Sequence, residues 1–162
     1  EKLENEKKIN QILVTSSTLS SSKIFEKFKF KKTIHQFFPI DKLNFTEKFL
    51  NFWKPSLIIF IDSEIWPNML LNISKKNIPT ILLNARITRK SFKRWMYFKS
   101  FAQKIFNCFD VTFPQNKETI EYLKSLKVKK IKFLGNIKFS ENEHLLKSTI
   151  SSKVKKFIKN KN

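Results

Sequence analysis

The stretch Leu57-Ile58-Ile59-Phe60-Ile61 decides the fold, because it is the most apolar run in the chain and is too short for an ordinary helix. Pro55 lies just before it and ends any helix that arrives from the N-terminal side. A continuous apolar run without alternating polar residues is typical of a strand buried on both faces, as in a parallel sheet. We therefore predict a parallel strand at residues 57–61 that is buried on both faces.

Similar apolar runs on both sides of this stretch alternate with longer amphipathic segments. We predict strands at residues 12–15, 33–37, 57–61, 80–83, 110–113 and 130–134. Helices are expected through about residue 29, from Asp41 or Asn44 as cap to about 53, from Pro67 to about 76, at 91–107 and at 116–126. Six alternations predict an α/β domain with a doubly wound, mostly parallel sheet. The single glycine argues against this prediction, because tight turns between strands and helices usually use more.

Composition favours a folded protein with an anionic partner. Of the 162 residues, 41% are hydrophobic, which is too many for a disordered chain, and the net charge is +20. An AT-rich genome also produces abundant Lys, Asn, Ile and Phe, so the charge permits an anionic partner without requiring one. The single Cys108 indicates a reducing compartment, and the sequence has neither a signal-peptide pattern nor an apolar run of roughly 20 residues that could span a bilayer.

Four polar clusters come directly after predicted strands. In open α/β sheets ligands bind beyond the carboxyl ends of the strands, so these clusters mark a candidate site. The clusters are Ser16-Ser17-Thr18, Asp62-Ser63-Glu64, Asn84-Ala85-Arg86 and Gly135-Asn136-Ile137-Lys138.

Each candidate residue also has a structural interpretation. Glu64 can hold a substrate hydroxyl or a neighbouring cation, or it can cap the helix that begins at Pro67. Arg86 can bind a phosphate, although an ion pair with Glu64 or Asp62 is slightly favoured. The remaining candidates are Ser16 and Thr18, which can bind an anion or cap a helix, Asn84 and Asn136, which can be turn residues, and Lys138, which can be a solvated lysine.

The segment 86–101 interleaves basic and aromatic residues. Such a helix can lie in an anionic membrane interface, but a helix packed on the sheet with a basic outer face is the preferred interpretation. His35 and His144 lack metal-ligand neighbours and are expected to be structural. The sequence contains no Walker loop, GxGxxG, GxSxG or zinc-ligand spacing, so nucleotide triphosphatase, dinucleotide, serine-hydrolase and zinc-site functions have no support and no metal site is expected.

Five segments of the chain match, in order, the motifs of one known family. They are 12–18, similar to the strand "LLVTTxT"; 35–41 (HQFFPID), similar to "HQ-aromatic-x-P-x-D"; 62–68 (DSEIWPN), similar to "ETELWPN"; 84–88 with Ser91, similar to "NARLS…S"; and 135–139 (GNIKF), similar to "GNLKF". The family that these segments resemble is the 3-deoxy-D-manno-octulosonic acid (Kdo) transferases. The resemblance covers residues 11–140, and the order and spacing of the motifs make it fairly specific.

The resemblance implies the N-terminal half of a GT-B glycosyltransferase, in which two Rossmann-like domains face each other across a cleft. This half would hold the lipid A precursor, and the other half would bind CMP-Kdo, the donor substrate. Transfer would be inverting, without a metal or cofactor, at the cytoplasmic face of the bacterial inner membrane. By motif, Glu64 and Lys138 match the residues assigned to transition-state stabilisation, and Asn84 and Arg86 would line the cleft with Ser16, Thr18 and Asn136 as further substrate-binding residues.

Two departures from the family pattern limit what this chain is expected to do alone. The family's general base is a glutamate in a Gly-Glu segment upstream of the first predicted strand, and we expect that segment to lie outside these 162 residues. We expect the CMP-binding domain to lie beyond residue 162. We therefore expect residues 1–140 to form the acceptor-side domain, truncated at its start, and residues 141–162 to form a linker and the start of the second domain. The chain alone is expected to be inactive and monomeric.

Two other functions remain open at this stage. A basic α/β module that binds nucleic acid would explain the net charge but not the acidic Asp62-Ser63-Glu64 corner, so no nucleic acid partner is expected. Another GT-B glycosyltransferase with a lipid acceptor is disfavoured by the segments at 63–68 and 84–86. Binding that depends on lipid would distinguish a Kdo transferase from the nucleic-acid-binding module. The identity of the sugar donor would distinguish it from another GT-B glycosyltransferase.

Overall fold

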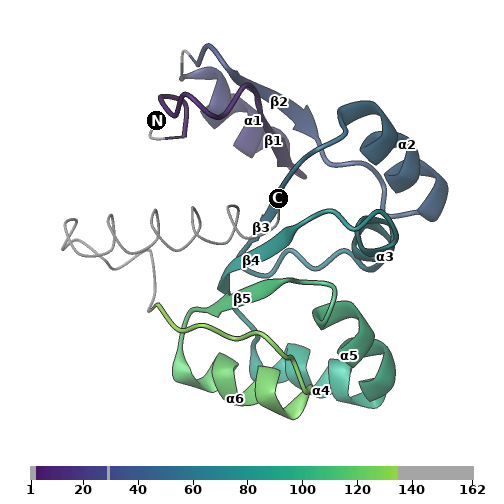
Figure 1. Ribbon diagram of the computed structural model, residues 1–162. Coiled ribbons are helices and arrows are strands. Elements are labelled where there is room, and N and C mark those ends of the chain that lie inside the picture. The colour runs from purple at the N-terminus through teal and green to yellow at the C-terminus, as the bar shows by residue number, and fades with distance from the viewer. Residues whose placement is uncertain (1–2, 29, 135–162) are drawn as a thin grey trace.

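The computed structural model describes residues 3–28 and 30–134, in which strands and helices alternate (Figure 1). The strands of these residues are β1 (Ile12–Ser16), β2 (Thr33–Phe37), β3 (Ile58–Ile61), β4 (Thr80–Ala85) and β5 (Val111–Pro114). The helices are α1 (Leu19–Glu26), α2 (Leu43–Trp53), α3 (Pro67–Lys75), α4 (Arg89–Tyr97), α5 (Lys99–Phe106) and α6 (Lys117–Ser125). The predicted boundary between residues 140 and 141 lies outside the described residues.

All strand pairs are parallel, which confirms the predicted α/β class. The strands form a two-stranded sheet, β1-β2, and a three-stranded sheet, β3-β4-β5. Among the described strands β1 and β3 do not pair, so the parallel strands fall into these two sheets. In Figure 1 the β1-β2 sheet and α1 lie at one end of the molecule, and α4, α5 and α6 gather at the other.

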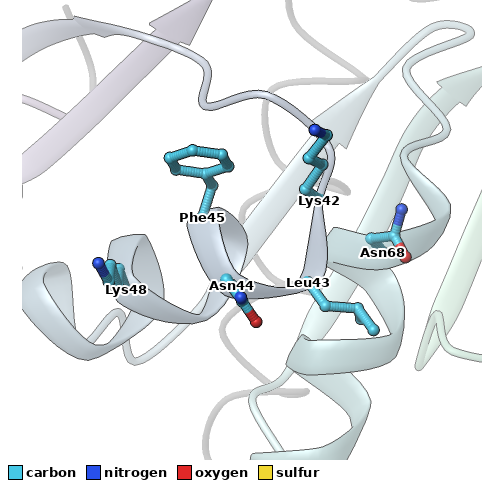
Figure 2. A pocket seen from close by; sticks show the side chains of 6 residues that line it. All are labelled: Lys42, Leu43, Asn44, Phe45, Lys48 and Asn68. Carbon is cyan, nitrogen blue, oxygen red and sulfur yellow. The ribbon is translucent and has the colours of Figure 1, made fainter.

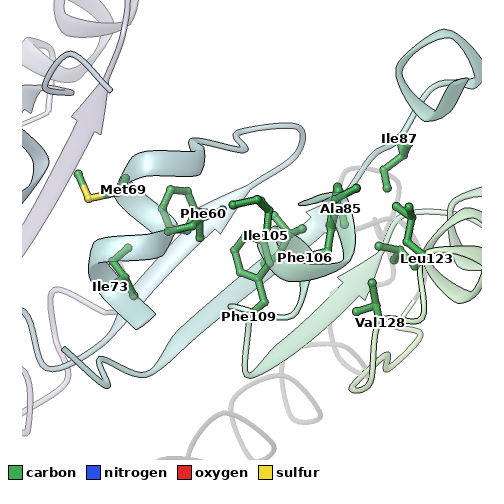
Figure 3. Close-up of a cluster of buried hydrophobic side chains, with 14 of the residues drawn as sticks. Phe60, Met69, Ile73, Ala85, Ile87, Ile105, Phe106, Phe109, Leu123 and Val128 are labelled. Carbon is green, nitrogen blue, oxygen red and sulfur yellow. The ribbon is translucent and has the colours of Figure 1, made fainter. Parts of the chain in front are cut away.

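The main core lies between the three-stranded sheet and the helices that follow its strands (Figure 3). Leu70 and Ile73 of α3 and Ile105 and Phe106 of α5 are fully buried there, each with 0% of its surface exposed. Phe60 and Leu82 supply the sheet side of the same cluster. Burial of these side chains holds the two helices against the sheet and so sets the position of the loops that follow β3 and β4.

The predicted two-sided burial of β3 is wrong. Phe60 is buried, whereas Ile59 is 39% and Ile61 is 53% exposed, so one face of the strand is open. The physical reason is that the helices of the main core cover only the face of β3 that carries Phe60. Ile59 and Ile61 point to the other face of the strand. An apolar run alone therefore did not show which face was covered.

The single helix predicted at residues 91–107 is two helices. The break falls at Phe98, whose φ of −122° and ψ of 53° end α4 and precede α5. The first of the two helices, α4, packs against the main core through one side, which consists of Phe92, Trp95 and Met96. This agrees with the predicted helix that is packed on one side and basic on the other. Tyr97 and Phe98 at the break remain exposed.

The strand predicted at 130–134 is reduced to one bridge between Thr112 and Ile131. Two hydrogen bonds support it: Thr112 N–H donates to the Lys130 carbonyl at 2.8 Å, and Lys132 N–H donates to the Thr112 carbonyl at 2.9 Å. The segment extends the sheet beside β5 without forming a regular strand.

Residues other than glycine adopt the positive φ angles that tight turns need. Asp62, Asn77 and Asn84 have φ of 59°, 53° and 55°, and Lys54 and Lys127 have φ of 42° and 53°. Asn and Asp tolerate the left-handed region better than other non-glycine residues. Two of these positions, Asp62 and Asn84, lie at the carboxyl ends of β3 and β4, where the chain turns toward the candidate site.

Candidate functional site

The two central polar clusters meet where β3 and β4 end. The Asn84 amide Nδ2 donates to Asp62 Oδ1, and Arg86 N–H donates to the Asp62 carbonyl at 3.2 Å. The Ser63 hydroxyl donates to the Arg86 carbonyl at 2.8 Å. The structure therefore joins residues 62–64 to residues 84–86, as the sequence predicted from their position after neighbouring parallel strands.

Glu64 is an exposed carboxylate with one oxygen held in place. The indole Nε1–H of Trp66 donates to Glu64 Oε2 at 2.8 Å. The Trp66 ring stacks on Phe38 at 4.9 Å between ring centroids, so the indole that holds the carboxylate is itself fixed. The second carboxylate oxygen can accept a hydrogen bond from a ligand hydroxyl or cation.

The alternative role of Glu64 as a helix cap is wrong. Trp66 is the N-cap residue of α3 and makes no side-chain capping bond. Asp41 supplies the cap instead, since its Oδ2 accepts from Asn68 N–H at 3.1 Å and its Oδ1 accepts from Met69 N–H at 2.8 Å. The Asp41 carbonyl also accepts from the Asn68 side-chain amide at 2.6 Å.

This Asp41–Asn68 clamp is the feature that sequence reasoning missed. Asp41 or Asn44 was predicted to cap α2, but the N-cap of α2 is Lys42, which makes no side-chain capping bond. The available signal was Trp66, whose side chain cannot cap the helix that Pro67 opens, which left the N–H groups of its first turn open to an acceptor from another segment. The clamp ties the segment 35–41 to the segment 62–68.

A hollow of about 590 Å³ opens beside the clamp (Figure 2). It lies at the N-terminal ends of α2 and α3, and therefore beyond the carboxyl ends of β2 and β3. Two lysines and two apolar side chains contribute most of its lining, which consists of Lys42, Leu43, Asn44, Phe45, Lys48 and Asn68. Such a lining fits a ligand that is both anionic and apolar.

Two side-chain oxygens near the ends of β4 and β5 are buried without a hydrogen-bond partner within the described part of the chain. They are Asn84 Oδ1 and Gln115 Oε1. Asn84 is only 3% exposed, and Gln115 N–H donates to the neighbouring Ala85 carbonyl at 2.9 Å. A buried acceptor without a partner is costly, so both oxygens suit a ligand or water that donates hydrogen bonds. Gln115 gave no signal in the sequence.

Arg86, Ser16 and Thr18 occupy different surroundings. Arg86 is exposed at the end of β4. Thr18 is the N-cap of α1 and accepts from Ser21 N–H at 3.3 Å, which is its structural interpretation. The Ser16 hydroxyl lies 2.8 Å from His35 Nε2, and no hydrogen bond among the described residues joins this pair to the Glu64 corner. Asn136 and Lys138 lie outside the described residues.

Two other features are absent from residues 3–28 and 30–134. No group of three or more His, Cys, Asp or Glu side chains in these ranges is placed to hold a metal ion. In the same ranges, no helix has the length and apolar character needed to span a membrane.

Parallel β-α units with polar groups at the carboxyl ends of the strands define a Rossmann-like ligand-binding domain. The family model described as 3-deoxy-D-manno-octulosonic-acid transferase (kdotransferase) matches residues 1–141. The chain belongs to the Kdo transferase family, whose members are glycosyltransferases.

Proteins named 3-deoxy-D-manno-octulosonic acid transferase are among the relatives. The one from Rickettsia typhi is 39% identical over 151 residues, which cover 93% of this chain and 32% of the relative. The one from Rickettsia felis is 44% identical over 135 residues, covering 83% of this chain and 29% of the relative. A protein of Arabidopsis thaliana named probable mitochondrial 3-deoxy-D-manno-octulosonic acid transferase is 42% identical over 84 residues, covering 52% of this chain and 19% of the relative. The chain thus spans about a third of the length of the Rickettsia relatives.

Proposed function

We propose that this chain is the acceptor-binding part of an enzyme that transfers Kdo from CMP-Kdo to the lipid A precursor. The transfer inverts the configuration of the sugar and uses no metal or cofactor. The enzyme works as a monomer at the cytoplasmic face of the bacterial inner membrane and does not bind nucleic acid. The observation that carries the proposal is the Asp41–Asn68 clamp, which puts Glu64 and the basic hollow at one edge of the domain.

The hollow supports an amphiphilic acceptor. A lipid A precursor combines anionic phosphates with acyl chains, and the hollow combines Lys42 and Lys48 with Leu43 and Phe45. The lysines would offset the phosphate charge, and the apolar side chains would contact the lipid. A ligand that lacked either feature would leave part of this lining without a complementary contact.

The reaction requires the acceptor hydroxyl to give its proton to a general base, which in the full-length protein would be the glutamate that the family uses upstream of the first strand, while its oxygen bonds to the anomeric carbon of Kdo and CMP departs. Glu64, fixed by Trp66, would accept a hydrogen bond from that hydroxyl or orient Lys138. Lys138 would offset the charge that develops on the CMP phosphate. Arg86, Asn84 and Asn136, with Ser16 and Thr18, would bind polar groups of the substrates.

The chain spans only part of its relatives, so the test uses the full-length protein. Transfer of Kdo from CMP-Kdo to the lipid A precursor is measured for Glu64→Gln, with Glu47→Gln as the control because Glu47 is exposed on α2 and does not line the hollow. We expect kcat to fall by about 100-fold or more for Glu64→Gln, which keeps the size of the side chain but loses its charge. Unchanged kcat for Glu64→Gln would remove Glu64 from the mechanism.

A second comparison tests the acceptor site. Lys42→Gln and Lys48→Gln are expected to raise KM for the lipid A precursor about fivefold each, while KM for CMP-Kdo and kcat stay near their original values. A KM change for CMP-Kdo alone would contradict the assignment of this domain to the acceptor. The 162-residue chain is expected to show no turnover of CMP-Kdo, and measurable turnover would refute that expectation.

A further inference from the structure

The ends of β4 and β5 bury two amide oxygens that lack a hydrogen-bond donor. Among the described residues, Asn84 Oδ1 and Gln115 Oε1 accept no hydrogen bond, although both atoms are buried. Asn84 as a whole is only 3% exposed. Folded proteins leave few buried polar atoms unpaired, because such an atom loses its bonds to water without replacement. The two oxygens therefore indicate a donor that the described part of the chain does not supply.

The orientation of the Asn84 amide is fixed by its neighbour. Its Nδ2 donates to Asp62 Oδ1, and an ionised carboxylate accepts hydrogen bonds but cannot donate them. Turning the amide over would place two acceptors against each other. The nitrogen therefore faces Asp62, and Oδ1 is presented as an acceptor to a group on its other side.

Gln115 presents the second acceptor at the same edge of the sheet. β4 and β5 are neighbouring parallel strands, with Ala85 opposite Pro114 (Figure 1). Gln115 N–H donates to the Ala85 carbonyl at 2.9 Å, which fixes Gln115 beside the end of β4. Paired strands are about 5 Å apart, so a single small ligand can reach both side chains.

A ligand of this pair must donate hydrogen bonds. An ionised phosphate presents oxygens that accept, so both amide oxygens would repel it, unlike the lysines that line the hollow beside α2. A sugar hydroxyl is neutral and donates one hydrogen bond. The Asp62 carboxylate and the Arg86 guanidinium belong to the same edge of the sheet, so their opposite charges favour neither an anion nor a cation.

We propose that Asn84 and Gln115 bind two hydroxyl groups of a sugar substrate. The inference rests on the proposed function, which supplies two sugars with such hydroxyls, Kdo and the glucosamine units of the lipid A precursor. It adds Gln115, which lies outside every motif of the family resemblance, as a residue that determines substrate specificity. A site built to bind hydroxyl groups rejects a ligand that lacks them, because its buried acceptors then stay unpaired.

A buried water could satisfy the same two oxygens without a ligand. Loss of a structural water would change the stability of the domain and leave sugar binding unchanged. Loss of a sugar contact would weaken binding of that sugar. Measuring both quantities for one variant separates the two explanations.

The first test follows the side-chain amide signals of Asn84 and Gln115 by nuclear magnetic resonance in the whole chain labelled with nitrogen-15. The chain is titrated with methyl N-acetylglucosaminide, with free Kdo and with inorganic phosphate at matched ionic strength. We expect one of the two sugars to shift both signals and phosphate to leave them in place. A response to the glucosaminide would assign the pair to the acceptor, and a response to Kdo would assign it to the donor sugar.

The second test replaces Gln115. Gln115→Met keeps a similar length but removes the acceptor, and is expected to raise Kd of the responding sugar about fivefold. In the full-length protein, KM for the matching substrate should rise by about the same factor, with kcat near its original value. Thr112→Val is the matched control: Thr112 Oγ1 is also buried without a partner in the described residues, but Thr112 alternates with Val111 and Phe113 and faces the other side of the sheet.

Three results would overturn the proposal. One is that neither sugar shifts the two amide signals. Another is that phosphate shifts them as strongly as a sugar does, which would make this an anion site. The third is a Gln115→Met variant with a lower Tm but an unchanged Kd and KM, which would assign the pair to a structural water. Sugar binding by Asn84 and Gln115 without Kdo transfer by the full-length protein would contradict only the proposed function, so the two proposals fail separately.

Discussion

Removal of the Asp41 carboxylate is expected to destabilise the domain more than removal of an exposed carboxylate. In Asp41→Ala, the main-chain N–H groups of Asn68 and Met69 lose acceptors at 3.1 and 2.8 Å. Loss of an N-cap side chain costs about 1 kcal/mol, and loss of a carboxylate near the positive end of a helix dipole costs up to about 1 kcal/mol more. Since α3 supplies the fully buried Leu70 and Ile73 to the core, we expect about 2 kcal/mol of lost stability and a Tm lower by about 4–8 °C.

Urea and thermal unfolding followed by circular dichroism measure this effect. Asp41→Asn keeps an acceptor oxygen but loses the charge, so it is expected to lose about half as much stability. Glu47→Ala is the control, because it removes an exposed carboxylate from α2. Equal stability of Asp41→Ala and Glu47→Ala would refute the reasoning that the Asp41–Asn68 clamp supports α3.

Three further predictions concern single groups. Trp66→Phe keeps the stacking surface but removes the donor to Glu64, and is expected to lower kcat of the full-length protein about tenfold or more with little change in Tm, measured by transfer kinetics and thermal unfolding. Hydrogen bonds from the Thr33 hydroxyl and from nearby main-chain N–H groups lower the pKa of Glu4. The stability that the Glu4 carboxylate contributes is therefore present above the ordinary glutamate pKa and is lost as pH falls through the lowered value. Glu4→Gln should flatten this part of the stability–pH profile. Burial raises the pKa of the Cys108 thiol, so it should react with a disulfide reagent more slowly in the folded than in the urea-unfolded chain, and equal rates would contradict this.

Much of the fold could be predicted because its signals are local. Short segments of four or five residues predicted the strands, and β2 has the same bounds as predicted, residues 33–37. Pro67 marked the first residue of α3. The break at Phe98 could not be predicted, because the hydrophobic spacing continues through it while the backbone changes direction.

The candidate site was predicted in part for the same reason. Parallel pairing of β3 with β4 brings their carboxyl ends together, so residues 62–64 and 84–86 were expected to meet. The partners of Asp41 and the burial of the Gln115 Oε1 atom could not be predicted, since they depend on contacts between segments far apart in the chain. The roles of Glu64 and Lys138 in catalysis stay predictions.

The sequence by itself determined the alternation of strands and helices and the family, because apolar runs, prolines and short motifs act over a few residues. Only the tertiary structure decided which side chain serves which helix and which apolar side chains are covered. Asp41 caps a helix that begins 26 residues later, Ile61 is left exposed beside the buried Phe60, and Phe92 is packed while Phe98 is not. Burial and hydrogen bonding depend on the neighbours that folding brings close, and local sequence does not specify those neighbours.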